Sequence, residues 1–174
     1  QLDGDWYRDI YLADSESGKI VNITLRPGNY RQPRFDPSGQ LIYFLEDHQL
    51  FYLFLERAVA ELAPMAQLEV LQTNGENGNS LKTRPVRIDF DQISERLTRL
   101  RHSGRAEQAV MLGDQWSFAL ATTAGDLWQV DLSGQRHLIV SGLKEMNDLC
   151  ASPSGSELFF RGSKGQIFVV EVGG

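Results

Sequence analysis

The chain has 174 residues, 41% of them hydrophobic, and a formal net charge of −6 at pH 7. This length and apolar content suffice for one packed core or for a share of a larger one. The acidic balance argues against nucleic acid as a partner, since phosphate binding requires clustered Lys and Arg. The sequence has no run of about eighteen apolar residues, so no membrane-spanning helix is predicted.

The first 55 residues alternate short β-forming runs with turn sequences. Two runs, 9–14 and 17–25, meet at a Ser-Gly pair, and a Pro-Ser-Gly turn at 37–39 precedes the apolar runs that end at 50–55. Ile, Tyr, Phe and Val favour pleated strands, whereas Pro and Gly preset turns. Strands joined by such short turns are antiparallel neighbours. The segment 1–55 is therefore predicted to hold half a blade plus most of the next blade.

An insertion is predicted at 56–85. Its first part has apolar residues at mixed spacing, typical of a short helix that breaks near Pro64. Its second part, TNGENGNSLKTRP, is rich in Gly and Asn and predicts a mobile surface loop. We expect limited proteolysis to cut first within 73–84. After the insertion, Val86, Ile88 and Phe90 alternate, which predicts a return to strand over 86–100.

The remaining sequence, 86–174, repeats the pattern of the first part. With an offset of 116 residues, Pro37 aligns with Pro153, Gly39 with Gly155, and Asp36 with Ser152. Asp36 and Ser152 are each predicted to accept a backbone N–H in their turns. A weaker copy lies at 109–131, so the repeat is about 43 residues without the insertion. A repeat of this length favours a propeller over a sandwich or barrel.

The predicted fold class is therefore all-β, a partial β-propeller of about three blades of four-stranded antiparallel sheet. The chain is interpreted as a single propeller segment over 1–174. About thirteen strands are expected, which make the outer half of one blade, two complete blades and three strands of another. Propellers close with four to eight blades, so both ends are expected to carry unpaired sheet edges. Such edges predict edge-to-edge self-association.

The histidines and the cysteine do not predict a metal or catalytic centre. His48, His102 and His137 lack a partner at metal-ligand spacing. We expect His48 in a solvated turn and His137 pointing outward from a strand. Cys150, the only cysteine, has no basic neighbour in sequence and is expected to be buried and inert. A single cysteine does not indicate the cellular compartment.

Other polar residues also fail to form a recognisable site. Asp3, Asp5 and Asp9 are close in sequence but lack the Gly-hinged spacing of a calcium loop. Ser38 and Ser154 lack the sequence of a nucleophile elbow. No catalytic, metal-binding or cofactor-binding residue is therefore predicted.

One basic run remains at 96–105. Its four arginines could attract acidic peptide tails or carboxylates; they are Arg96, Arg99, Arg101 and Arg105. The alternative interpretation is that these side chains cover a solvated pair of strands.

Two segments resemble tricorn-like serine peptidases. VRIDFDQISERLTRL, at 86–100, is similar to the family's IDxDGIxxR line, which follows a comparable insertion in its propeller. RQPRFDPSGQLIYFLEDHQ, at 31–49, resembles the family's SPDG line. Gln92 replaces the usual Gly, Ser38 replaces Asp, and His48 stands where Arg is common. TolB-like propellers share the SPDG-like turns.

The resemblance implies a function in binding rather than catalysis. In tricorn-like peptidases the propeller precedes a PDZ-like domain and a catalytic domain, and nothing in this sequence matches either. The family's catalytic residues therefore have no counterpart here. The implied function is a non-catalytic propeller that guides or gates peptide substrates or mediates protein interaction. Its partners would be peptides, proteins and the remaining domains of a parent chain.

Two other functions compete with this one. The alternative from a different class is a TolB-like scaffold propeller for protein–protein interaction, with no protease attached. A free-standing hydrolase is disfavoured, because nucleophile, base and orienting residue cannot be named together.

Overall fold

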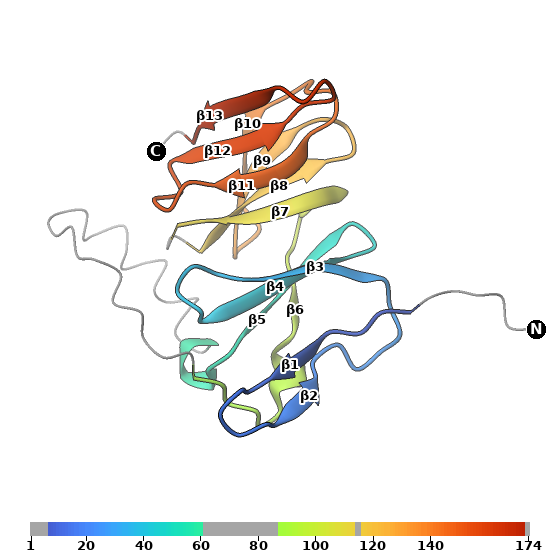
Figure 1. The fold of residues 1–174 in the computed structure, drawn as a ribbon, viewed down its shortest axis with the longest axis vertical. Coiled ribbons are helices and arrows are strands. Elements are labelled where there is room, and N and C mark those ends of the chain that lie inside the picture. Colours follow the sequence, from blue (N-terminus) through green and yellow to red (C-terminus); the bar gives the residue numbers. More distant parts are fainter. Residues whose placement is uncertain (1–6, 61–86, 114–115, 173–174) are drawn as a thin grey trace, which may run out of the picture. The chain divides into compact units, whose positions relative to one another are not determined.

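The computed structural model describes residues 7–60, 87–113 and 116–172. These residues form thirteen β-strands in four antiparallel sheets, together with short helical turns. In chain order the sheets contain two, four, four and three strands. This arrangement confirms the predicted all-β partial propeller, with half a blade, two complete blades and three strands of another (Figure 1).

The chain divides into two compact units, which are described separately. The first unit covers the described residues up to Asp47 and from Phe51 to Arg99. Its elements are β1 (Tyr11–Ala13), β2 (Ile20–Asn22), β3 (Tyr30–Phe35), β4 (Leu41–Glu46), β5 (Gln49–Phe54), the 3-10 helix η2 (Ile93–Arg96) and β6 (Thr98–Arg99). Strands β1 and β2 pair with each other, and β3, β4, β5 and β6 form a sheet in that order.

The second unit comprises His48–Leu50 and the described residues from Leu100 onward. Its strands are β7 (Ala106–Leu112), β8 (Ser117–Thr122), β9 (Leu127–Asp131), β10 (Arg136–Val140), β11 (Asn147–Ala151), β12 (Glu157–Arg161) and β13 (Ile167–Glu171). Strands β7 to β10 form one sheet and β11 to β13 form the next, and the two sheets meet along β7 and β11 (Figure 1).

The two sheets of the second unit repeat each other in register. Met111 pairs with Phe118 between β7 and β8, and Ala151 pairs with Leu158 between β11 and β12. Both members of the second pair lie forty residues after those of the first. Strand β13 therefore corresponds to β9. Among the described residues, the sheet β11–β13 has no fourth strand that would correspond to β10.

The predicted capping of the Pro-Ser-Gly turns is confirmed. The Asp36 carboxylate accepts the Leu41 N–H at 2.6 Å and the Ser38 N–H at 3.0 Å. At the matching position, the Ser152 hydroxyl oxygen accepts the Glu157 N–H at 3.1 Å. The side chain before each proline therefore holds the first backbone group of the following strand.

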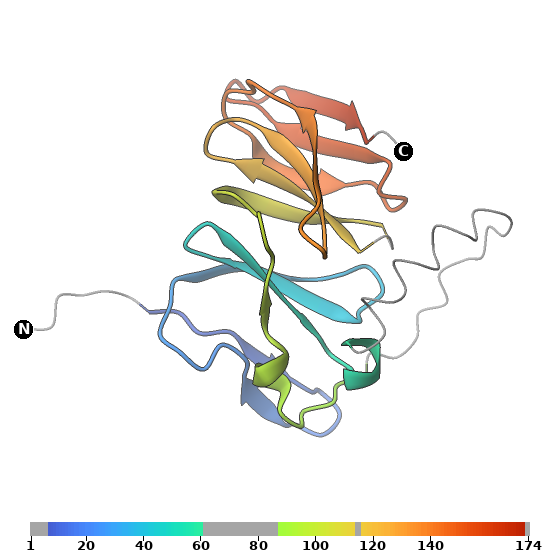
Figure 2. The ribbon, with the colours of Figure 1, turned by 180° about the vertical axis from the view of Figure 1, so that it is seen from behind.

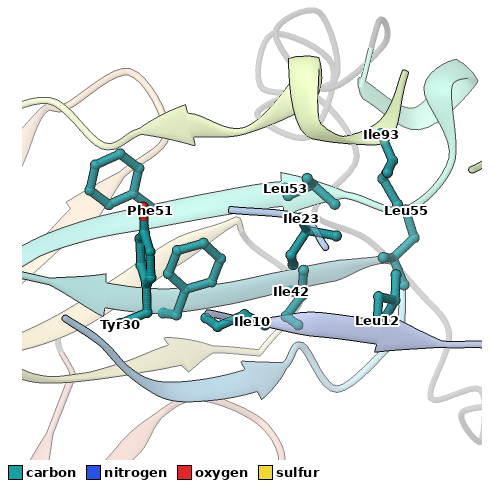
Figure 3. Close-up of a cluster of buried hydrophobic side chains, with 10 residues drawn as sticks. Ile10, Leu12, Ile23, Tyr30, Ile42, Phe51, Leu53, Leu55 and Ile93 are labelled. Carbon is teal, nitrogen blue, oxygen red and sulfur yellow. The ribbon is translucent and has the colours of Figure 1, made fainter. Parts of the chain in front are cut away.

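The core of the first unit lies between the β1–β2 pair and the sheet β3–β6. Figure 3 shows its apolar side chains converging from both sheets and from η2. Ile23, Leu53 and Leu55 are fully enclosed. Phe44 stacks on Phe51 with ring centroids 6.1 Å apart. This cluster takes alternate residues of β4 and β5, and most of the residues on the other face of these two strands are buried as well.

The core of the second unit lies between its two sheets. Ala119, Ala121 and Leu127 from the first sheet pack with Leu158 and Phe160 from the second. Small residues of β8 and large residues of β12 thus share one core.

The prediction of a strand over 86–100 is wrong for most of the described part of that segment. Residues 87–92 form no strand, Ile93–Arg96 form η2, and only Thr98–Arg99 pair in a sheet (Figure 2). Ile88 and Phe90 pack against the first core from outside any strand, and the Asp89 N–H between them donates to the Leu55 carbonyl oxygen at 2.9 Å. Gln92 has a positive φ of 47°, which ends the extended conformation before η2.

Much of the insertion lies outside the described residues. Residues 57–60 form a helical turn, whereas 61–86 are not described. The predicted cleavage region at 73–84, and Val86 of the predicted strand, belong to that range. In the described part of the chain, no helix has the length and apolarity needed to cross a membrane.

Candidate functional site: a pocket in the second unit

A pocket of about 520 Å³ lies in the second unit, where the β8–β9 turn meets the connection from β10 to β11. Its lining comes from Glu107 at the start of β7, from residues 121–125 and from residues 143–146. Three segments that are distant in sequence thus build one concave surface.

Gly125 allows the two connections to approach closely. The Leu143 N–H donates to the Gly125 carbonyl oxygen at 2.8 Å. Gly125 has a φ of +84°, and a Cβ at this position would clash with the Leu143 carbonyl oxygen. Thr122 and Asp126 close the turn around it, because the Thr122 N–H donates to the Asp126 carbonyl oxygen at 2.9 Å. A residue larger than glycine would push the pocket's two walls apart.

The floor of the pocket is apolar and continuous with the core. Ala121 and Met146 are buried members of the second core, and the half-buried Leu143 packs against it. Gln108 fixes the Met146 end of the floor. Its side-chain amide donates to the Met146 carbonyl oxygen at 2.6 Å and accepts the Leu149 N–H at 2.8 Å. This side chain therefore joins β7 to the start of β11.

The rim of the pocket is charged and contains Glu107, Lys144 and Glu145. The pairing register of β7 with β8 shifts between Ala106 and Gln108, so Glu107 lies in a β-bulge. Glu145 has a positive φ of 59°. Bulges redirect side chains and often occur beside functional sites. The rim carries two carboxylates against one ammonium group.

His48 lies in the β4–β5 turn, as expected, and its half-exposed ring also contacts this rim. Its Nδ1 lies 3.1 Å from Glu107 Oε1 and 3.3 Å from the Ala106 carbonyl oxygen. Its side chain is 31% exposed. The β4–β5 turn brings His48 to the bulge of β7, a contact between residues 59 positions apart that sequence spacing could not indicate.

Arg96, one of the four arginines of the basic run, is engaged inside the first unit. Its guanidinium donates to the carbonyl oxygens of Phe54 at 3.1 Å and Leu55 at 3.0 Å, and also to that of Asp89. Burial lowers the pKa of the Arg96 guanidinium from its ordinary value. These contacts anchor η2 to the end of β5.

The other three arginines have exposed side chains. Arg99 lies on β6 of the first unit, whereas Arg101 and Arg105 lie in the second unit before β7. Arg105 also accepts the Thr123 N–H at its carbonyl oxygen, 3.1 Å away, and so supports the turn that lines the pocket. A contact of these arginines with peptides or carboxylates stays a prediction.

Cys150 is exposed, so the expectation of a buried thiol is wrong. On β11 the neighbouring residue Leu149 occupies the inward position, so alternation turns Cys150 to the opposite face. Its Sγ lies 3.7 Å from the Phe159 carbonyl oxygen. His137 on β10 is exposed, as expected.

The serines of the two Pro-Ser-Gly turns take part in local hydrogen bonds. The Ser38 hydroxyl donates to the Asp36 carboxylate, and the Ser154 hydroxyl lies 2.7 Å from that of Ser156. Across the described residues, no group of three or more His, Cys, Asp or Glu side chains is placed to hold a metal ion.

Similarity to known proteins is detectable in structure but not in sequence. No family model and no curated protein sequence matches this chain. The crystal structure of the tricorn protease superposes with a TM-score of 0.66 at 16% identity, covering 99% of this chain and 19% of that one. TolB from Acinetobacter baumannii superposes with a TM-score of 0.57 at 14% identity, covering 97% of this chain and 36% of that one.

This chain therefore spans about a fifth of the tricorn protease chain and about a third of the TolB chain. Identities this low establish the fold and no more. Together with the repeated antiparallel sheets, these superpositions show that the chain has a partial β-propeller fold, similar to the matching parts of the tricorn protease and TolB structures.

Proposed function

We propose that this chain is the non-catalytic propeller portion of a tricorn-like serine peptidase, where it guides or gates peptide substrates or mediates protein interaction. The observation that carries the proposal is the pocket of the second unit. It combines an apolar floor with a charged rim, as peptide-binding pockets do. The superposition on the tricorn protease supports the same assignment at the level of fold.

The surroundings of the serines support binding without turnover. A serine nucleophile needs a base within hydrogen-bonding reach. The hydroxyls of Ser38 and Ser154 instead bond to Asp36 and to neighbouring serines. Beside the pocket, His48 contacts the Glu107 carboxylate and the Ala106 carbonyl oxygen.

A direct test measures binding and hydrolysis together. The 174-residue chain is incubated with a degenerate library of fluorescein-labelled octapeptides, and bound and cleaved peptides are separated and counted. We expect selective retention of intact peptides and no hydrolysis above a protein-free blank. Hydrolysis that disappears when a single serine of the chain is replaced would contradict the proposal.

A TolB-like scaffold propeller is the second candidate, and one surface favours it. Cys150, Phe159 and Val169 lie opposite one another in register across β11, β12 and β13. Val169 is 54% exposed and the neighbouring Ile167 is 73% exposed. An apolar sheet face of this kind suits a protein partner better than a small substrate.

The two candidates differ in what accompanies this chain in the cell. Antibodies raised against the 174-residue chain would isolate the native protein, which is then treated with a fluorophosphonate probe for active serines. Labelling of the same polypeptide, with turnover of peptide substrates, is expected for the peptidase. Recovery of unlabelled protein with a stable protein partner would support the scaffold instead.

A further inference from the structure

We infer that two exposed apolar sheet faces of this chain bind each other between copies, so that the chain associates head to tail. The first, the β13 face, lies on the side of the sheet β11–β13 away from the second core and comprises Cys150, Phe159, Ile167 and Val169. The second, the β1 face, lies on the side of the β1–β2 pair away from the first core and comprises Tyr11, Ala13 and Ile20. The inference does not depend on the proposed function.

The β13 face repeats a face that another sheet covers in the same unit. A shift of forty residues matches Ala119 with Phe159 and Leu127 with Ile167, and their cross-strand pairing shifts by the same amount. Ala119 and Leu127 are fully buried in the core shared with the sheet β11–β13. Ile167, by contrast, is 73% exposed and Val169 is 54% exposed. The repeat thus indicates that the β13 face is covered by a further sheet.

Strand β1 corresponds to β9, and therefore to β13. DIYLAD at 9–14 repeats DLWQVD at 126–131, and the two hairpins close in the same way. The Ser17 hydroxyl donates to Asp14 Oδ2 at 2.5 Å, and the Ser133 hydroxyl donates to Asp131 Oδ1 at 2.6 Å. By this correspondence Tyr11 occupies the position of Phe168.

The β1 face is the type of face that covers a neighbouring sheet. In β13, Phe168 stacks on Phe160 with ring centroids 5.2 Å apart, and Val170 packs against the core shared with the preceding sheet. Tyr11 and Ala13 are the counterparts of Phe168 and Val170. Tyr11 is nevertheless 60% exposed, and Ile20 on the paired strand is 66% exposed. The β1 face therefore suits a partner sheet that resembles the β13 face.

Neighbouring sheets in each unit join unlike faces. The face of β1–β2 that holds Ile10 packs on the face of β3–β6 that holds Phe44. At the matching positions, the face with Leu127 packs on the face with Phe160. The β13 face is of the first kind and the β1 face of the second. A contact between unlike faces of two copies is heterologous, so it builds rings or open chains rather than closed pairs.

The test blocks one face at a time with lysines, since a charge buried in an apolar contact opposes association. Ile167→Lys/Val169→Lys blocks the β13 face, and Tyr11→Lys/Ile20→Lys blocks the β1 face. Light scattering at micromolar concentration should show that the wild-type chain grows beyond two copies, whereas each variant remains a single chain. Leu138→Lys, at a 40% exposed position of β10 outside both faces, should associate as the wild type does.

Mixing the two blocked variants distinguishes a head-to-tail contact from any other. Each variant keeps one intact face, and the intact faces are complementary, so the mixture should form a 1:1 complex that does not grow further. Formation of this complex also shows that both variants are folded. If circular dichroism shows that a double variant is unfolded, the single substitutions Ile20→Lys and Val169→Lys take its place.

Cys150 provides a second readout, because it is the only cysteine of the chain and its exposed thiol lies on the β13 face. Association should slow its alkylation by iodoacetamide several-fold as the protein concentration rises. Tyr11→Lys/Ile20→Lys should restore the fast rate, although these substitutions lie in the other unit.

Three results would overturn the inference. They are a wild-type chain that stays monomeric, folded variants that stay monomeric when mixed, and association that persists in Tyr11→Lys/Ile20→Lys. The last result would mean that copies meet through β13 alone. None of them changes the expectation that the chain binds peptides.

Discussion

Gly125 is the single residue on which the shape of the pocket depends most. Its replacement by Ala adds a methyl group that clashes with the Leu143 carbonyl oxygen. The φ of +84° is also a backbone conformation that residues other than glycine rarely adopt. Gly165, at the matching turn forty residues later, is the control, since its φ is +79° but a methyl group there would have no neighbour within 4 Å. We predict that Gly125→Ala loses about 1–3 kcal/mol more than Gly165→Ala in urea unfolding. Equal losses would mean that the close approach is not a constraint.

Gln108 joins the two sheets of the second unit through one side chain. Gln108→Ala leaves the Met146 carbonyl and the Leu149 N–H without this partner. The loss of these two hydrogen bonds should lower the free energy of unfolding by about 0.5–1.5 kcal/mol each. The exposed Gln135 provides the control, because Gln135→Ala should change stability by no more than about 0.5 kcal/mol. Chemical denaturation of both variants measures the difference, and similar stabilities would show that the Gln108 contacts contribute nothing.

At the scale of elements, the side chains that cap the two Pro-Ser-Gly turns should contribute differently to the free energy of unfolding. Asp36 is 7% exposed and accepts two backbone N–H groups, whereas Ser152 accepts one. Asp36→Ala should therefore cost about 1–2 kcal/mol and Ser152→Ala less. Ser152→Asp, which supplies a second acceptor oxygen, should retain wild-type stability or raise it. Thermal unfolding of the three variants gives their order of stability. A larger loss of stability for Ser152→Ala than for Asp36→Ala would contradict these capping roles.

The strands were predictable from sequence where local signals agree. Strands β4, β8 and β12 combine β-forming residues with flanking Pro-Gly or Gly turns, and their pairing partners follow within a few residues. Ile88 and Phe90 alternate and pack on the core just as in a strand, and the Asp89 N–H between them donates to the Leu55 carbonyl oxygen, yet the segment does not form a strand. Alternation reports which side chains face inward and does not report whether the backbone is paired.

The pocket could not be predicted from sequence, for a related reason. The pocket brings together Glu107, Gly125 and Leu143, which belong to three separate segments of the chain. A local sequence pattern does not predict contacts between segments this far apart. The Thr-Ala-Gly-Asp stretch at 123–126 is typical of a turn, but nothing in it indicates that a second connection lies against it. The exposure of Cys150 likewise depends on what covers the outer face of β11.

At the scale of the whole molecule, β13 is a surface disposed to self-association. It ends its sheet, and Ile167 and Val169 are 73% and 54% exposed. Such an edge recruits another strand, so we predict that the chain is not a monodisperse monomer at micromolar concentration. Static light scattering should show that Val169→Lys lowers the apparent mass, whereas Ser163→Lys in the adjacent turn does not. A monomeric wild-type chain would contradict this prediction.

The central claim is that this propeller region binds peptides in its second-unit pocket without cleaving them. Hydrogen–deuterium exchange with and without an octapeptide that the chain retains from the degenerate library tests it most directly, because backbone amides at a binding site gain protection. We predict slower exchange at 121–126 and 141–146, unchanged exchange at the matching turn 162–166, and intact peptide recovered at the end. Protection confined to other segments, or recovery of cleaved peptide, would contradict the claim.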